Sequence, residues 1–144
     1  QRPELIDELA DRFGSQCTVL AVDAARRESG SWEVVVDGGR TRTGRDTEQW
    51  IRSAADRGAG EILLTSWDRD GTRSGYDLEL IEAITATVDI PVIASGGADN
   101  VDHLEEALSS GATAVLIASI LHDGVTTVDT LKRQLLANGT EVRP

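Results

Sequence analysis

The segment of residues 61–77 reads EILLTSWDRDGTRSGYD and decides the fold. Its first six residues, Glu61–Ser66, are an apolar run with the length and composition of a buried strand. A loop of carboxylates, hydroxyls and glycines follows this run. Residues 91–98, which read PVIASGGA, repeat the scheme with an apolar strand that ends in the loop SGGA. Two successive buried strands therefore end in small polar loops.

Each of these polar loops leads into a predicted helix. A turn of this kind exposes amide groups that have no partner within the helix, and such groups favour an anion. In a parallel sheet the C-terminal ends of neighbouring strands lie at the same edge. The sequence therefore predicts a phosphate site on the C-terminal rim of a parallel sheet.

Four strand-then-helix units follow one another along the chain. The predicted strands are Cys17–Val22, Glu61–Ser66, Pro91–Ala94 and Ala112–Ala118. The predicted helices are Glu4–Phe13, Asp46–Arg57, Asp77–Thr87, Val101–Ser110 and Thr127–Asn138. An inserted β-hairpin after the first strand is predicted from the alternating segment Ser31–Val36, the turn DGG and the segment Arg40–Thr43. No linker interrupts the series, so we predict a single α/β domain over residues 1–144.

A parallel sheet of four strands poses a packing problem. With all its helices on one side, such a sheet leaves its other face apolar and both edges unpaired. Right-handed crossovers keep successive helices on the same side unless the strand order reverses. The sheet can reverse its strand order to make an open sandwich, or it can close with four more strands into an eight-stranded barrel. The pattern of strands and helices does not separate these two solutions.

The composition excludes several classes of protein. Apolar residues make up 40% of the chain and charged residues 27%, which is ordinary for a globular protein. No apolar run approaches the roughly 20 residues that span a bilayer, and no basic, apolar leader precedes Glu4, so we expect a cytoplasmic protein without a membrane partner. The net charge of −11 argues against nucleic acid as a partner. Cys17 stands alone in an apolar run and is predicted to be a buried structural thiol.

Three motifs resemble those of a known family. Residues 61–77, residues 91–98 and the sequence AVDAARR of residues 21–27 are similar to the cyclase subunit of imidazole glycerol phosphate synthase, an enzyme of histidine biosynthesis. The resemblance covers nearly the whole chain, but it matches only the C-terminal half of that subunit. It implies a parallel (βα)4 half of a TIM (βα)8 barrel, in which the four strands here are the fifth to the eighth.

The resemblance also implies an activity. In this family, ammonia from a partner glutaminase travels through the barrel and attacks a bis-phosphorylated ribulosyl aminoimidazole substrate. Cyclisation and cleavage then give imidazole glycerol phosphate and aminoimidazole carboxamide ribotide, and the resemblance implies neither a cofactor nor a metal. Two aspartates act as general acid and general base, at the ends of the first and fifth strands. Only the second has a match here, at Asp23.

Asp23 and Asp70 are the predicted catalytic residues. Asp23 ends an apolar strand, where its carboxylate would face the loops that carry catalysis in barrels, and partial burial would raise its pKa as a proton shuttle requires. A helix cap, or an ion pair with Arg26 or Arg27, is the alternative. The resemblance puts Asp70 beside the substrate, where a plain turn is the alternative. The family commonly has lysine two residues after the first aspartate, and Ala25 stands there instead, so one substrate contact of the family has no counterpart here.

The other predicted substrate-binding residues would form a phosphate cradle. The resemblance implies contacts from Thr65, Gly71, Ser95, Gly96, Gly97, Ala118 and Ser119. The two glycines of SGGA would let the phosphate approach the backbone closely. The D-x-D-G spacing is not that of a calcium loop, in which the glycine stands at the sixth position.

Glu61 lies at the opposite end of its strand from these residues. The resemblance implies that it belongs to a charged ring that gates ammonia, whereas the alternative is a charge that begins a strand. His103 and His122 lack the spacing of metal ligands, so we expect surface or capping roles for them. We expect packing roles for the three tryptophans, Trp32, Trp50 and Trp67.

Two other functions stay open beside the cyclase half. A non-catalytic, phosphate-binding half-barrel scaffold would keep the site without the activity. The phosphoribosyl isomerase of the same pathway shares the DGT sequence of the loop but departs around it. In either case a half-barrel does not fill its own core, so we expect it to form a homo-oligomer or to pair with an N-terminal half-barrel.

Overall fold

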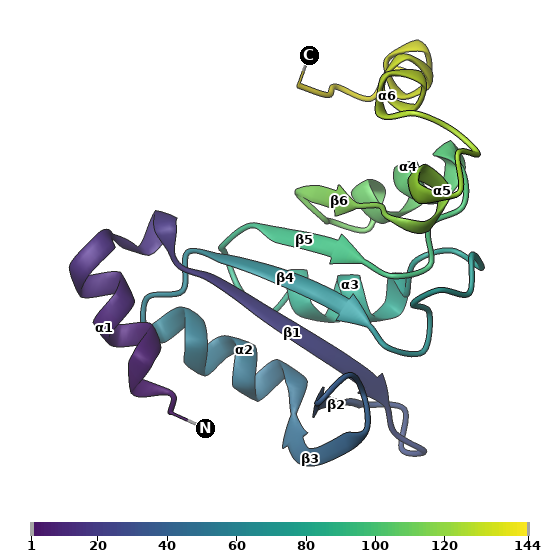
Figure 1. Ribbon diagram of the computed structural model, residues 1–144. Coiled ribbons are helices and arrows are strands. Elements are labelled where there is room, and N and C mark those ends of the chain that lie inside the picture. The colour runs from purple at the N-terminus through teal and green to yellow at the C-terminus, as the bar shows by residue number, and fades with distance from the viewer. Residues whose placement is uncertain (1, 144) are drawn as a thin grey trace.

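The computed structural model describes residues 2–143 and contains one six-stranded sheet with its helices (Figure 1). The strands are β1 (Val19–Arg26), β2 (Trp32–Val36), β3 (Thr41–Asp46), β4 (Glu61–Ser66), β5 (Val92–Ser95) and β6 (Ala114–Leu116). The α-helices are α1 (Glu4–Phe13), α2 (Thr47–Asp56), α3 (Leu78–Thr85), α4 (Val101–Ser109), α5 (Ser119–His122) and α6 (Val128–Ala137), and a 3₁₀ turn, η1, spans Ser15–Cys17.

The sheet is rich in parallel strands. Its order is β3-β2-β1-β4-β5-β6, in which β1, β4, β5 and β6 run parallel and β2 runs antiparallel to both its neighbours. Strands and helices alternate along the parallel part, as they do in part of a TIM barrel. The predicted α/β class with a parallel sheet is therefore confirmed.

Four helices begin where the sequence predicts because a side chain caps each of them. Asp46, Asp77, Asn100 and Thr127 each accept a hydrogen bond from the backbone amide three residues later. Such a bond satisfies one of the amides that a helix leaves unpaired at its start, and it stabilises the helix by about 1 kcal/mol. The observed helix ends differ from the predicted ends by no more than two residues.

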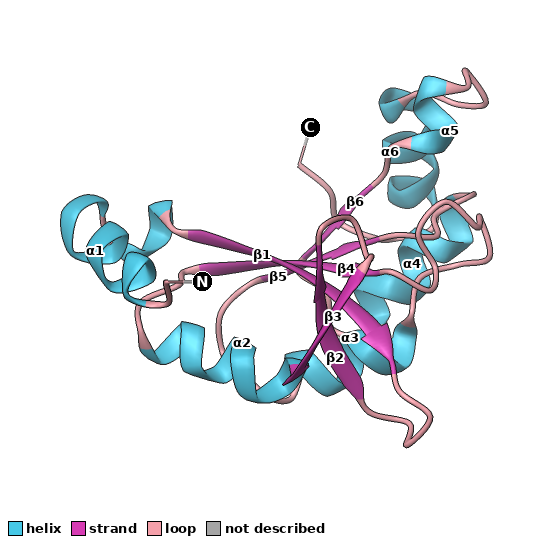
Figure 2. Cartoon of the chain, turned by 60° about the horizontal axis from the view of Figure 1, so that its bottom comes forward, coloured by secondary structure: helices cyan, strands magenta, loops and turns pink. Residues whose placement is uncertain are grey.

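The two faces of the parallel sheet have different surroundings. Ile62 and Leu64 of β4 are buried beneath the helices, together with Val92 of β5. Figure 2 shows α1, α2, α3 and α4 following one another along that side of the strands. The alternate residues lie on the opposite, open face, where Val19 is 50% exposed and Leu116 is 40% exposed. We call these two sides the covered face and the open face.

The first parallel strand differs from the prediction Cys17–Val22. The strand begins at Val19, because backbone hydrogen bonds from Cys17 to Gly14 and from Thr18 to Ser15 hold the preceding residues in a turn. It also continues past Asp23 to Arg26, since β2 pairs with these residues and supplies their hydrogen-bond partners. Cys17 is consequently exposed, so the prediction of a buried thiol is wrong.

The last parallel strand is shorter than the predicted Ala112–Ala118. Only Ala114–Leu116 form β6, which lies at the edge of the sheet and pairs with β5 alone. The backbone leaves the extended conformation at Ala118, where φ is −135° and ψ is −66°. The short helix α5, which the sequence did not predict, begins at the next residue. Among residues 2–143, no helix is both long enough and apolar enough to cross a membrane.

Candidate functional site

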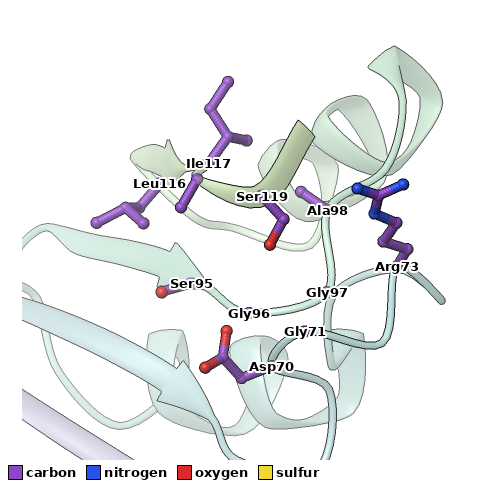
Figure 3. Close-up of a pocket in the computed structure, with 11 residues that line it drawn as sticks. Asp70, Gly71, Arg73, Ser95, Gly96, Gly97, Ala98, Leu116, Ile117 and Ser119 are labelled. Atoms are coloured by element: carbon purple, nitrogen blue, oxygen red, sulfur yellow. The ribbon is translucent and has the colours of Figure 1, made fainter. Parts of the chain in front are cut away.

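A small cavity opens among three loops at the C-terminal ends of β4, β5 and β6 (Figure 3). Its volume is about 30 Å³, which is room for a small polar group. Of the predicted cradle residues, those that line it are Gly71, Ser95, Gly96, Gly97, Ala118 and Ser119. The predicted catalytic residue Asp70 lines it as well, and its carboxylate points toward Ser95 in Figure 3. The structure therefore brings together seven residues that the sequence assigned to one site.

Two hydrogen bonds tie the three loops to one another. The amide of Gly75, in the loop after β4, donates to the carbonyl of Gly97 after β5 at 2.9 Å. The phenol of Tyr76 donates to the carbonyl of Leu116, the last residue of β6, at 2.9 Å. Tyr76 is buried, and burial raises the pKa of its phenol, so the group remains a proton donor at neutral pH. Sequence reasoning missed this tyrosine, because nothing in the motif indicates where its hydroxyl ends.

Gly96 and Gly97 are required by the close approach of these loops. Both have a positive φ, of 96° and 101°, which residues with a side chain rarely adopt. A Cβ atom on Gly97 would lie 2.2 Å from the carbonyl oxygen of Gly75, and one on Gly96 would lie 2.9 Å from that of Ser66. The two glycines therefore let the loop after β5 run directly against the loop after β4.

Two backbone amides of residues that line this cavity have no hydrogen-bond acceptor in the described part of the chain. Among the described residues, the amides of Gly71 and Gly97 have no hydrogen-bond acceptor. Gly97 is also buried, and a buried amide without an acceptor is uncommon in folded proteins. Unpaired amides of glycine-containing loops are groups that bind phosphate or carboxylate in many proteins. The cavity therefore has the chemistry of an anion site.

Asp23 lies beside this cavity because of the register of the sheet. Asp23 of β1 pairs with Thr65 of β4, which pairs with Ser95 of β5, so the three residues form one row on the open face. Partial burial raises the pKa of the Asp23 carboxyl, and the negative charge of Asp70 raises it further. A raised pKa brings a carboxyl group closer to the range in which it can both donate and accept a proton. Asp23 is inside β1, however, and not at its end as predicted.

Asp77 supports the site from the covered face, and sequence reasoning identified it only as the start of a helix. Its carboxylate accepts hydrogen bonds from the indole of Trp32, the hydroxyl of Ser66 and the amide of Leu80, each at 3.2 Å. Asp77 is buried, so these three donors satisfy a charge that would otherwise be costly to bury. The residue joins β2, the end of β4 and the start of α3. The loop that carries Asp70 is therefore anchored where it enters α3.

The other predicted residues lie outside the cavity. Thr65 has its place in the row with Asp23 but does not line the cavity. Glu61 pairs with Val19 at the opposite end of the sheet and is half-buried on the open face. His103 accepts a hydrogen bond from the amide of Asp99.

The histidines and tryptophans do not line the cavity. His122 is exposed at the end of α5. Trp32 is buried in the core and Trp50 packs against it, whereas Trp67 is 39% exposed and covers Gly39 at the turn between β2 and β3. Within residues 2–143, no group of three or more His, Cys, Asp or Glu side chains could hold a metal ion.

Comparisons with known proteins show the family to which this chain belongs. A family model described as "Histidine biosynthesis protein" matches residues 1–127. The chain is 55% identical over 149 residues to the imidazole glycerol phosphate synthase subunit HisF of Synechococcus sp. strain CC9605. This alignment covers 100% of the chain and 58% of that relative. The chain is 56% identical over 142 residues to the subunit of the same name from Streptomyces avermitilis, which covers 99% of the chain and 57% of the relative.

A third relative of the same name, from Gluconacetobacter diazotrophicus, is 51% identical over 142 residues, with 99% of the chain and 55% of the relative covered. The chain therefore spans a little over half the length of these curated relatives. All three carry the name of the synthase subunit that the motifs resemble. Since the family model covers most of its residues, this chain belongs to the histidine biosynthesis protein family.

Proposed function

We propose that this chain is one half of a cyclase of imidazole glycerol phosphate synthase type, and that it folds as a single (βα)4 half-barrel domain over residues 1–144 with the β2–β3 hairpin inserted after β1. It supplies one phosphate cradle and one of the two catalytic carboxylates. Such a half would bind one phosphate of a bis-phosphorylated substrate and act in the cytoplasm. The relatives' printed name supports the reaction, and the geometry of the cavity supports the cradle.

One observation carries this proposal: the row of Asp23, Thr65 and Ser95 leads to a cavity that Ser95 lines and at which two amides have no acceptor among the described residues. With the phosphate held by the loops after β5 and β6, the reacting part of the substrate extends over the open face toward Asp23. Burial and the charge of Asp70 raise the pKa of Asp23, so its carboxyl can give or take the proton that cyclisation moves. Asp70 would contact the substrate from the loop after β4.

The open face supports a partner for this half. On the open face, Val19 and Leu116 are exposed apolar side chains, and on α1 the side chains of Leu5, Leu9 and Phe13 are also between 36% and 55% exposed. A closed barrel would remove this surface from water. We therefore infer that the chain pairs with an N-terminal half-barrel, or with a second copy of itself where that half is absent. Light scattering should give a mass above that of one chain, and a stable, well-folded monomer would contradict the pairing.

The cyclase assay tests the function itself. The chain is mixed with the N-terminal half of a cyclase subunit, supplied with the bis-phosphorylated substrate and an ammonium salt, and followed for release of aminoimidazole carboxamide ribotide. Asp23→Asn should abolish release, because the amide cannot exchange the proton. Asp102→Asn, which removes an exposed carboxylate on α4, is the matched control and should keep full activity. Equal rates in the two variants would exclude a catalytic role for Asp23.

Two parts of the proposal concern ammonia. Glu61, at the end of the sheet opposite to Asp23, would belong to the charged ring that admits ammonia to the barrel. A glutaminase subunit would dock on that end and supply the ammonia. If so, Glu61→Gln should change the rate with glutamine and glutaminase more than the rate with ammonium salt, since free ammonia also enters from the open rim.

The second candidate is a phosphate-binding scaffold without activity. The cavity has features of an anion site, and phosphate binding there does not by itself require a reaction. In that case phosphate would bind, and no product would form with any N-terminal half.

A further inference from the structure

Arg73 is the one basic side chain among the residues that line the cavity (Figure 3). It stands in the loop between β4 and α3, two residues after Gly71. Asp70 also lines the cavity and carries a negative charge that opposes an anion. The chain as a whole carries a net charge of −11, which opposes it further. Without a cation, the amide dipoles alone would have to offset the repulsion of an anion by Asp70 and by the net charge of the chain. A positively charged side chain at the cavity would reduce this repulsion.

The backbone of Arg73 is in an unusual conformation. Its φ is +58°, in the left-handed region, which among the described residues other than glycine is shared only by Asp37. A residue with a side chain adopts this region at a cost in free energy, and such outliers gather at binding sites. Glycine would fit here without strain, yet an arginine occupies the position.

The guanidinium of Arg73 is held by carboxylates that can release it. It forms an ion pair with Asp123, after α5, and a longer contact of 3.9 Å with Asp99, in the loop after β5. The side chains of these three residues are 38%, 59% and 40% exposed. Ion pairs with this exposure stabilise a protein by little, since water solvates both charges well. A phosphate dianion offers a guanidinium two parallel hydrogen bonds and a larger charge.

We propose that Arg73 is a further phosphate-binding residue of this cavity, and that its guanidinium exchanges Asp123 for the phosphate when the ligand binds. The inference rests on the proposed function, in which the cavity takes one phosphate of the substrate. Arg73 then supplies the full positive charge that the backbone amides of Gly71 and Gly97 lack. It also gives the cavity a preference for a dianion over a monoanion.

Binding of inorganic phosphate tests the inference. Amide NMR signals of the cavity glycines are followed while phosphate is added at constant ionic strength. Arg73→Gln should weaken binding by about tenfold, as expected for the loss of a hydrogen-bonded charge. Arg69→Gln is the matched control, because it removes the same charge from the same loop at a residue that bonds to Ser74 and does not line the cavity. It should weaken binding by less than about twofold.

The outcomes separate this inference from the function on which it rests. If the unmodified chain does not bind phosphate, the proposed cradle is wrong. If it binds phosphate and both arginine variants bind it equally well, or weaken equally, then the cradle stands and the role of Arg73 is refuted. Arg73→Lys keeps the charge without the planar fork and should give an intermediate affinity.

Asp123→Asn distinguishes phosphate binding from a purely structural ion pair. If Arg73 binds phosphate, removal of its competitor should tighten binding several-fold, and this gain should vanish in the Arg73→Gln background. If the ion pair serves only to hold the loops together, Asp123→Asn should instead loosen the cavity and weaken binding. A weaker affinity in Asp123→Asn would therefore overturn the inference.

Discussion

The covered and open faces of one sheet share the same strands but depend on different parts of the molecule. On β4, Leu64 is 1% exposed beneath the helices, whereas its neighbour Leu63 points to the open face and is half-buried. The helices of this chain bury the side chains of the covered face without a partner. The open face carries Asp23 and exposed apolar side chains, which the proposed second half would remove from water. Packing of the core therefore depends on one side of these strands, and the chemistry that we propose takes place on the other side.

The sharpest test of this comparison is a pair of substitutions at adjacent residues. Leu64→Ala should lower the free energy of unfolding by about 3 kcal/mol, since it leaves a cavity in a packed core. Leu63→Ala removes the same atoms from a half-buried position and should cost less than about 1 kcal/mol in the isolated chain. Urea denaturation of both variants measures the difference. Equal costs would mean that the open face is already covered, for example in a homodimer.

A second test concerns the anchor below the site. Asp77→Ala should cost about 2–3 kcal/mol, because it removes a helix cap and leaves the buried indole of Trp32 without an acceptor. Asp46→Ala is the control. The Asp46 carboxylate also caps a helix, α2, by accepting a hydrogen bond from the amide of Gln49, but Asp46 is only partly buried. It should cost about 1 kcal/mol. If the two variants have the same midpoint in urea, Asp77 is no more than an ordinary cap.

The smallest expected effect is on the open face and has the opposite sign. The pKa of Asp23 is raised above its ordinary value of 3.8 in the folded chain, so the unfolded chain ionises more readily as the pH increases. Ionisation of Asp23 therefore opposes folding above that pH, and the cost is absent below it, where both states are protonated.

Asp23→Asn should accordingly stabilise the chain at neutral pH, by less than about 1 kcal/mol because the group is partly exposed. The gain should shrink as the pH falls toward 3.8. Thermal unfolding of both proteins across this pH range measures the change. If the variant is less stable at neutral pH, the ionised carboxylate of Asp23 makes a favourable contact in the folded chain, and its ionisation does not oppose folding.

The candidate site was largely predictable because its residues follow strand ends in the sequence. The apolar runs before DRDGTRSGYD and SGGA fixed where the loops begin, and parallel strands bring such loops to one edge. Helix starts were predictable for a similar reason, since Asp46 and Asp77 cap their own helices through contacts three residues away.

Contacts between distant segments were not predictable. Tyr76 reaches the carbonyl of Leu116, which is 40 residues away, and Trp32 reaches Asp77 across 45 residues. No local pattern specifies such a partner. The extension of β1 past Asp23 has the same origin, because it depends on pairing with β2 and not on the propensities of its own residues.

The sequence by itself determined the α/β class, the order of elements and the loops that carry the site, because apolar periodicity and capping act over a few residues. Only the tertiary structure decided that Asp23 lies in one row with Thr65 and Ser95, and that Arg73 shares a cavity with Asp70. These placements depend on strand register and on the approach of separate loops. Both are set by packing across the whole sheet, which no local segment contains.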